Sequence, residues 1–134
     1  MPSDTAPLTI PFGRPMLGAE ESAAVAQVLA GPQLVHGPVA RDFEQAFAAR
    51  VGVEHAVSLS SCTAGLHLSL LASDIGPGDE VVVPAMTHVA TAHAVEHCGA
   101  TPVFADVDPV SGNIDPDRVA ATITPATRAV IVVH

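Results

Sequence analysis

The chain has 134 residues, of which 49% are hydrophobic, and its mean hydropathy of +0.42 indicates a folded core rather than a disordered chain. A formal net charge of −9 argues against a nucleic-acid-binding surface, because phosphate contacts require clustered cations. No apolar run is as long as the roughly 18 residues that a membrane-spanning helix needs. The chain has two cysteines and no signal-peptide pattern, which fits the reducing cytoplasm, and we predict that location.

The N-terminal residues predict a flexible arm followed by a helix. Residues 1–9 are polar and contain two prolines, so we expect no regular structure there. Glu20 and Glu21 are typical of the first turn of a helix, and Gly31 and Pro32 are typical of its end. We expect this helix to pack one apolar stripe against the fold, formed by Val25, Val28 and Leu29.

A second helix is predicted from residue 39 onward. Val39, Phe43 and Phe47 recur at i, i+4 and i+8, so we expect them to form a single buried stripe. The loop before this helix contains His36. This histidine could approach a substrate or could be an exposed loop residue, and the sequence leaves both readings open.

From residue 55 onward the sequence alternates between apolar strand patterns and helix patterns. Continuous apolar runs at 81–83 and 129–133 are typical of strands that are covered on both faces. Regular alternation with helices implies mainly parallel pairing. We therefore predict an α/β fold of three layers, with helices on both faces of a mainly parallel sheet. The expected strands are residues 55–59, 81–84, 101–106 and 128–134, and the later helices are residues 89–97 and 115–123.

Two junctions in this pattern carry the residues of a candidate binding site. Ser60, Ser61 and Thr63 follow the first strand and can cap the helix after it. The free backbone N–H groups of such a helix start can hold an anion such as phosphate, although many capped turns bind none. Thr87 and His88 follow the next strand. Ligands of open parallel sheets lie beyond the carboxyl ends of strands, so both junctions are expected to face one ligand.

Four segments occur together in an order that is specific to one family. They are Ser61–Leu66, Gly78–Pro84, Thr87–Thr91 and Gly99–Asp108. In this order they closely resemble the pyridoxal-phosphate sugar aminotransferases of the DegT/DnrJ/EryC1/StrS family, and the resemblance runs from about residue 10 to residue 134. It implies that residues 10–134 are the N-terminal portion of the large domain of a fold type I transferase, with the C-terminal remainder absent.

The resemblance also assigns a site. It implies that Ser61, Cys62, Thr63 and Ala64 hold the phosphate of pyridoxal 5'-phosphate and that His88 stacks on the pyridine ring. Family members usually carry glycine where this chain has Cys62 and Phe or Trp where it has His88. The lysine that binds the cofactor covalently would lie downstream, and all five basic residues of this chain are arginines. We therefore expect that this chain contains no catalytic residue and binds no cofactor covalently. We also expect the chain to be inactive by itself.

For the full family enzyme the resemblance implies transfer of an amino group, with glutamate as the donor and a keto group of a nucleotide-linked sugar as the acceptor. It further implies a homodimer. Neither nucleic acid nor membrane is an expected partner.

Two other interpretations stay open at this point. His93, Glu96 and His97 spell H-x-x-E-H, in which two histidines on one helix face could bind zinc beside a general base. A zinc hydrolase is thus the alternative, but it requires a third protein ligand, and no metal ligand is predicted. The absence of lysine also fits a non-catalytic remnant or partner protein.

Overall fold

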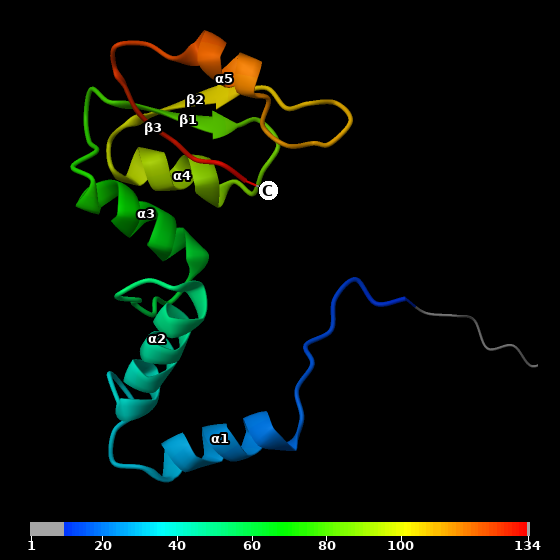
Figure 1. Cartoon of the computed structure of the whole chain (residues 1–134), viewed down its shortest axis with the longest axis vertical. Helices are drawn as coiled ribbons and strands as arrows, with labels where there is room; N and C mark the ends of the chain where they lie inside the picture. Colours follow the sequence, from blue (N-terminus) through cyan, green and yellow to red (C-terminus); the bar gives the residue numbers. More distant parts are fainter. Residues whose placement is uncertain (1–9, 134) are drawn as a thin grey trace, which may run out of the picture. The chain divides into compact units, whose positions relative to one another are not determined.

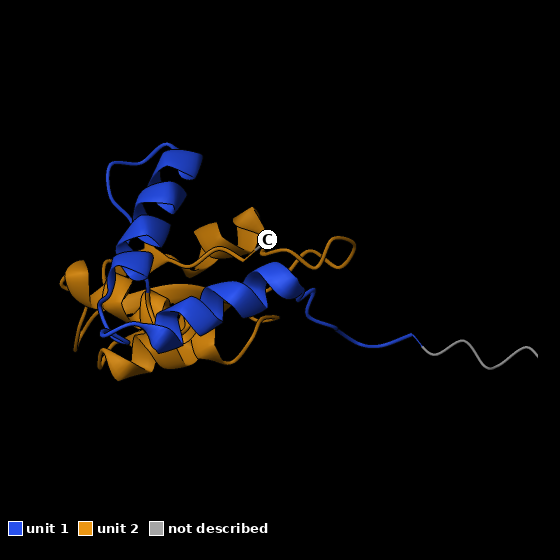
Figure 2. Ribbon diagram, turned by 90° about the horizontal axis from the view of Figure 1, so that it is seen from below, with its two compact units in different colours: residues 1–58 blue, residues 59–134 orange. Residues whose placement is uncertain are grey.

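The computed structural model describes residues 10–133 and divides the chain into two compact units, residues 1–58 and 59–134 (Figure 2). The predicted arm at 1–9 lies outside the described residues, and the single-domain assignment of 10–134 stays a prediction. In chain order the elements are α1 (Ala19–Ala30), α2 (Pro38–Val51), α3 (Cys62–Ala72), β1 (Glu80–Pro84), α4 (Ala90–His97), β2 (Thr101–Ala105), α5 (Pro116–Thr122) and β3 (Thr127–Val130) (Figure 1).

The first unit contains both predicted N-terminal helices. α1 begins where the Glu21 carboxylate accepts the backbone N–H of Gly18 at 2.6 Å, and this hydrogen bond lowers the pKa of Glu21 below its usual value. α2 begins with Pro38 at its first position and ends at Gly52, whose left-handed φ of +77° suits a residue without Cβ. The start and stop signals predicted for the first helix therefore lie at the two ends of α1, with Glu20 and Glu21 in its first turn and Gly31 after its last.

The apolar stripes of these helices are not buried, and this part of the prediction was wrong. Phe43 and Phe47 are exposed by 58% and 52%, although their rings pack together with centroids 6.0 Å apart. In α2 only Ala48 is buried, and α1 has no buried residue. An amphipathic helix needs a facing layer to bury its stripe, and two helices in this unit are too few to supply one.

The predicted strand at 55–59 is also absent from the structure. These residues have no regular secondary structure and no strand pairing, and Val57 is exposed. The segment is held by Glu44, whose Oε1 accepts both the backbone N–H and the hydroxyl of Ser58 at 2.8 and 2.7 Å. The Ser58 backbone N–H in particular lowers the pKa of Glu44. An extended apolar run becomes a strand only beside a partner strand, and the structure places none there.

The second unit is built on a parallel three-stranded sheet in the order β2-β1-β3. β1 lies in the centre, pairs in parallel with both neighbours, and is fully buried from Val81 to Pro84. The registers place Glu80 opposite Thr101 and Pro84 opposite Ala105 on one side, and Val82 opposite Val130 on the other. The prediction of a central strand covered on both faces is confirmed for β1.

Helices cover both faces of this sheet. α4 packs beneath β1 and β2, α3 packs against α4, and α5 lies over the opposite face beside β2 (Figure 1). The predicted α/β class, with a parallel sheet between helical layers, is confirmed. Among the described residues no helix combines the length and apolar character required to cross a membrane. The core between β1, α3 and α4 consists of Leu70, Ile75, Val81, Val83, Ala94, Val95, Cys98 and Ala100.

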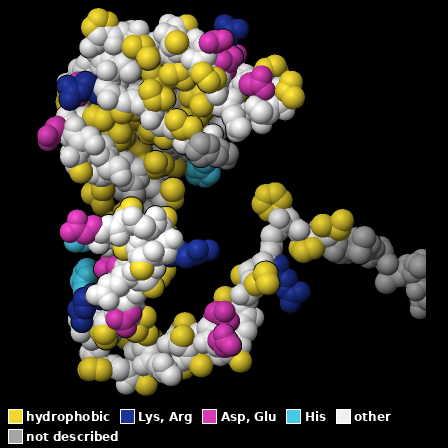
Figure 3. All heavy atoms as spheres, viewed as in Figure 1, with side chains coloured by type: hydrophobic (Ala, Val, Ile, Leu, Met, Phe, Trp, Pro, Cys, Tyr) yellow, Lys and Arg dark blue, Asp and Glu magenta, His cyan; other side chains and the backbone are white. Residues whose placement is uncertain are grey.

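β3 differs from its prediction in length and burial. The strand ends at Val130, although the Ile131 N–H still donates to the carbonyl of Val82 at 2.9 Å. Ile131 packs against the core, whereas Val130 and Val132 are exposed by 39% and 53%. β3 is an edge of the sheet, so it has one partner strand and leaves backbone groups and one apolar side uncovered. Figure 3 shows apolar side chains gathered on this unit.

Leu70 and Leu71 provide a matched test of the core, because they are neighbours on α3 with exposures of 6% and 45%. We expect Leu70→Ala to lower the free energy of unfolding by about 2–5 kcal/mol, because it removes buried methyl groups and leaves a cavity. Leu71→Ala should cost about 1 kcal/mol or less. Urea denaturation measures both, and equal losses would contradict the assigned core.

The uncovered edge at β3 predicts self-association of the 134-residue chain. We expect oligomers above the 13.6 kDa monomer in size-exclusion chromatography with light scattering. Val130→Lys should shift the distribution toward monomer because a charge on an edge strand opposes pairing, whereas the uncharged Val130→Thr should not. A monodisperse wild-type monomer would contradict this prediction.

Candidate functional site

The candidate site is a cavity of about 500 Å³ in the second unit. Three segments line it: the start of α3 with Cys62 and Thr63, the turn between β1 and α4 with Thr87 and His88, and the residues that follow β3. Its volume lies in the range of about 300–1,000 Å³ that is typical of ligand pockets. The structure thus brings together residues from both predicted junctions.

Ser61 is the N-cap residue of α3, the role that the sequence predicted for the hydroxyl residues of this turn. Its backbone is extended, with φ −163° and ψ 160°, and its Oγ accepts the backbone N–H of Ala64 at 3.1 Å. Its carbonyl accepts the N–H of Gly65 at 3.1 Å. Cys62 and Thr63 are the first residues of the helix, so no carbonyl within the helix lies one turn earlier to accept their N–H groups. These two amides are therefore available to an anion in the cavity that both residues line.

Cys62 is compatible with this turn. It is the first residue of α3 and is absent from the residues with positive φ, so the position does not require glycine. Its thiol is free and exposed. Ala64 differs from the other phosphate-binding candidates because its N–H already donates to Ser61. Phosphate binding by all four residues, Ser61 to Ala64, stays a prediction, and Cys62 and Thr63 offer the most available donors.

His88 lies at the start of α4 and borders the same cavity. Its Nδ1 accepts the backbone N–H of Ala90 at 3.1 Å, and its carbonyl accepts the N–H of Thr91 at 3.0 Å. The ring is exposed, so it can contact a bound ligand. Stacking of His88 on a pyridine ring stays a prediction.

A hydroxyl pair beside His88 was not assigned a role from the sequence. Thr87 Oγ1 and Thr91 Oγ1 lie 3.2 Å apart, and both residues line the cavity. Thr91 is buried, with 4% of its surface exposed. The spacing of i and i+4 at the start of a helix is the signal that could have identified this pair.

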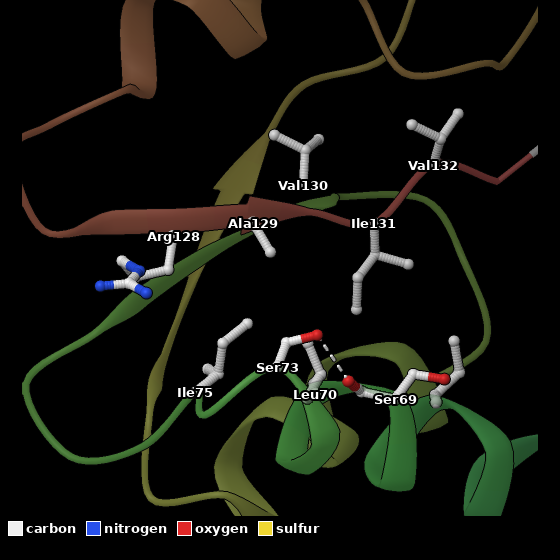
Figure 4. Close-up of a pocket in the computed structure, with 10 residues that line it drawn as sticks. Ser69, Leu70, Ser73, Ile75, Arg128, Ala129, Val130, Ile131 and Val132 are labelled. Atoms are coloured by element: carbon white, nitrogen blue, oxygen red, sulfur yellow. Dashed lines mark hydrogen bonds between the residues drawn. The ribbon is translucent and has the colours of Figure 1, made fainter.

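A second cavity, of about 380 Å³, lies between α3 and β3 (Figure 4). In Figure 4 Ile131 points toward α3, whereas Val130 and Val132 point away from it. Ser73 Oγ donates to the carbonyl of Ser69 at 2.9 Å, and Arg128 is the charged residue of the lining. This cavity is mainly aliphatic, and its lining does not include the α3 start or the β1–α4 turn that border the candidate site.

His36 belongs to the first unit. It has a left-handed φ of +52° and lines a cavity between α1 and α2 together with Val28 and Phe43. Its approach to a substrate stays one of two open readings.

The H-x-x-E-H pattern does not form a metal centre in the described residues. His93 and His97 lie on α4 with ring centroids 6.3 Å apart, and His67 of α3 packs against His97 at 5.6 Å. No group of three or more His, Cys, Asp or Glu side chains within residues 10–133 is arranged to hold a metal ion. Among the residues that the structure describes, the zinc hydrolase alternative therefore lacks the third ligand that it requires.

Comparison with known proteins finds relatives that match most of this chain. The chain is 48% identical over 125 residues to the spore coat polysaccharide biosynthesis protein SpsC of Bacillus subtilis (strain 168), covering 93% of this chain and 32% of SpsC. It matches the PLP-form of "Putative sugar aminotransferase Spr1654" from Streptococcus pneumoniae with a TM-score of 0.88 and 34% identity, over 92% of this chain and 31% of that one. It matches the aminotransferase TlmJ from Streptoalloteichus hindustanus with a TM-score of 0.80 and 47% identity, over 85% and 32%.

The chain spans about a third of the length of these relatives. The model of the DegT/DnrJ/EryC1/StrS aminotransferase family matches residues 15–134, which include every element of the sheet and both sides of the cavity. This protein therefore belongs to the DegT/DnrJ/EryC1/StrS aminotransferase family and corresponds to part of the family enzyme.

Proposed function

We propose that this chain provides the phosphate- and ring-binding wall of a pyridoxal-phosphate-dependent sugar aminotransferase. The observation that carries the proposal is the meeting of the α3 start and the β1–α4 turn around one cavity of about 500 Å³. A related structure is known in a PLP-form, which supports the same cofactor here. When bound, the cofactor supplies an electron sink for transfer of the amino group.

The start of α3 suits the phosphate group. Cys62 and Thr63 have backbone N–H groups without an acceptor inside the helix, and the positive end of the helix dipole points the same way. Thr63 adds a hydroxyl at the cavity wall. Ser61 keeps the helix start in place by accepting the Ala64 N–H, so the donors are fixed before a ligand arrives.

The β1–α4 turn suits a flat ring. His88 presents an exposed imidazole at the cavity, while Leu66 and Ile131 supply aliphatic surface on the other walls. An aromatic ring bound there would contact His88 on one side and apolar side chains elsewhere, which excludes water from its faces. The chain's residues thus bind and orient the cofactor.

The remaining parts of the proposal concern the whole enzyme. We propose glutamate as amino donor, a nucleotide-linked sugar as acceptor, a homodimer as the assembly and the cytoplasm as the location. The two free cysteines, Cys62 and Cys98, support a reducing compartment. Because the sequence contains no lysine, we assign no catalytic residue to it and propose that the chain by itself holds the cofactor without a covalent bond.

Substitution of Cys62 can test the phosphate site while preserving the helix. Cys62→Pro removes one backbone N–H at the first helical position, where proline is well tolerated, and Ser61 already has the extended backbone that precedes proline. We expect pyridoxal phosphate to bind the wild type weakly and reversibly. Cys62→Pro should weaken it roughly 10- to 100-fold, as for loss of a hydrogen bond to a charged group.

Cys62→Ala is the matched control, because it removes the thiol and retains the N–H. It should bind like the wild type in an absorbance titration, and circular dichroism should show that both variants are folded. Treatment with borohydride should trap no adduct within residues 58–88. The proposal fails if the wild type does not bind the cofactor, or if the Pro and Ala variants bind it equally well.

A further inference from the structure

The turn that joins β1 to α4 has few backbone hydrogen bonds of its own. It is anchored where it leaves the sheet, because the Ala85 N–H donates to the carbonyl of Ala105 at 2.9 Å. Within the part of the chain that the structure describes, no backbone N–H group of residues 86–89 donates to an acceptor in the protein. The shape of such a turn depends on its side-chain contacts.

The hydroxyls of Thr87 and Thr91 make the contact that joins the middle of this turn to the helix. Their Oγ1 atoms lie 3.2 Å apart, and among the described residues this is the one hydrogen bond of either hydroxyl. Thr91 lies in the first turn of α4 and is 4% exposed, whereas Thr87 is half-buried. The pair therefore connects a buried residue of the helix to a residue of the turn, and both line the candidate cavity.

The two hydroxyls differ in what happens when the partner is removed. A buried hydroxyl without a partner bears the full cost of leaving water, whereas a partly exposed hydroxyl can bond to water instead. The Thr91 hydroxyl is the buried one, so it depends on Thr87 more than Thr87 depends on it. Other staggered rotamers of Thr87 would move its Oγ1 away and leave Thr91 unpaired. The buried hydroxyl thus favours a single Thr87 rotamer.

We propose that Thr91 is a positioning residue: its buried hydroxyl holds the Thr87 side chain in one rotamer, so that this part of the cavity wall is arranged before a ligand binds. A ligand that enters the cavity then does not have to order that side chain, which would reduce its affinity. Thr91 acts through Thr87 and needs no contact of its own with the ligand. This step rests on the proposed function.

The rotamer of Thr87 tests the proposal in the cofactor-free chain. Three-bond couplings between the backbone and the Thr87 Cγ2 methyl group, measured by nuclear magnetic resonance, should report one χ1 rotamer in the wild type. Thr91→Val replaces the hydroxyl by a methyl group of similar size, and the Thr87 couplings should then average over several rotamers. Thr91→Ser retains the hydroxyl and should restore the single rotamer. An averaged Thr87 in the wild type, or a single rotamer in the Val variant, would overturn the proposal.

Urea denaturation tests the predicted difference between the two hydroxyls. Thr87→Val leaves the buried Thr91 hydroxyl unpaired and should raise the unfolding equilibrium constant roughly 5- to 150-fold. Thr91→Val should raise it less, because the Thr87 hydroxyl reaches water. The double variant should be more stable than Thr87→Val, since it leaves no buried hydroxyl unpaired. Equal losses in the two single variants, or a double variant that loses the sum of both, would contradict the proposal.

Titration with pyridoxal phosphate tests the effect on the site. Thr91→Val should bind it roughly two- to tenfold more weakly than the wild type, the range for ordering one free side chain, and Thr91→Ser should bind like the wild type. Thr122→Val is the matched control, because the Thr122 hydroxyl donates to the carbonyl of Val119 in α5 at 2.9 Å and Thr122 does not line the cavity. This control should leave binding unchanged.

The link between Thr91 and the site fails if Thr91→Val binds the cofactor as tightly as the wild type, or if Thr122→Val weakens binding equally. If the wild type itself does not bind, the proposed function fails and the effect on binding fails with it. The coupling and urea measurements still decide whether Thr91 fixes the Thr87 side chain, so the two failures are distinguishable.

Discussion

The second unit depends on the burial of β1 between two parallel neighbours. Val81, Val82 and Val83 have no exposed surface, and both edges of the strand are hydrogen-bonded, so neither the side chains nor the backbone of β1 contact water. This arrangement requires helices on both faces, which α4 and α5 supply. Because the strands run in parallel, the segments that leave their carboxyl ends meet at one edge of the sheet, where the candidate cavity lies.

The starts of two helices border that cavity, and a different kind of side chain caps each of them. Ser61 caps α3 with a hydroxyl, and His88 caps α4 with a ring nitrogen. In both cases a side chain satisfies an N–H that the helix itself leaves free, and a rigid helix then determines where the neighbouring groups point. The same bonds that begin the helices thereby arrange the candidate binding groups, so local stability and site geometry are linked.

The exposed apolar surfaces of the two units share one physical cause. Phe43 and Phe47 form a correctly spaced helical stripe, and Val130 and Val132 follow the alternation of a strand, but neither set faces a second layer among the described residues. An apolar pattern specifies which side of an element avoids water without specifying what covers it. The relatives are about three times as long as this chain.

Local chemistry in the sequence determined most of the elements and the two junctions whose residues border the candidate cavity. Glycine, proline and acidic residues specified the ends of α1 and α2, the apolar run specified β1, and the motifs around Cys62 and His88 identified the family. Tertiary structure decided those features that require a second segment of the chain beside the first. The segment at 55–59 lacks a neighbouring strand, β3 lies at an edge, and the His88 cap depends on the path of the turn after β1. Strand formation, burial and side-chain hydrogen bonds require a second group in the right place, and that place is set by the fold as a whole.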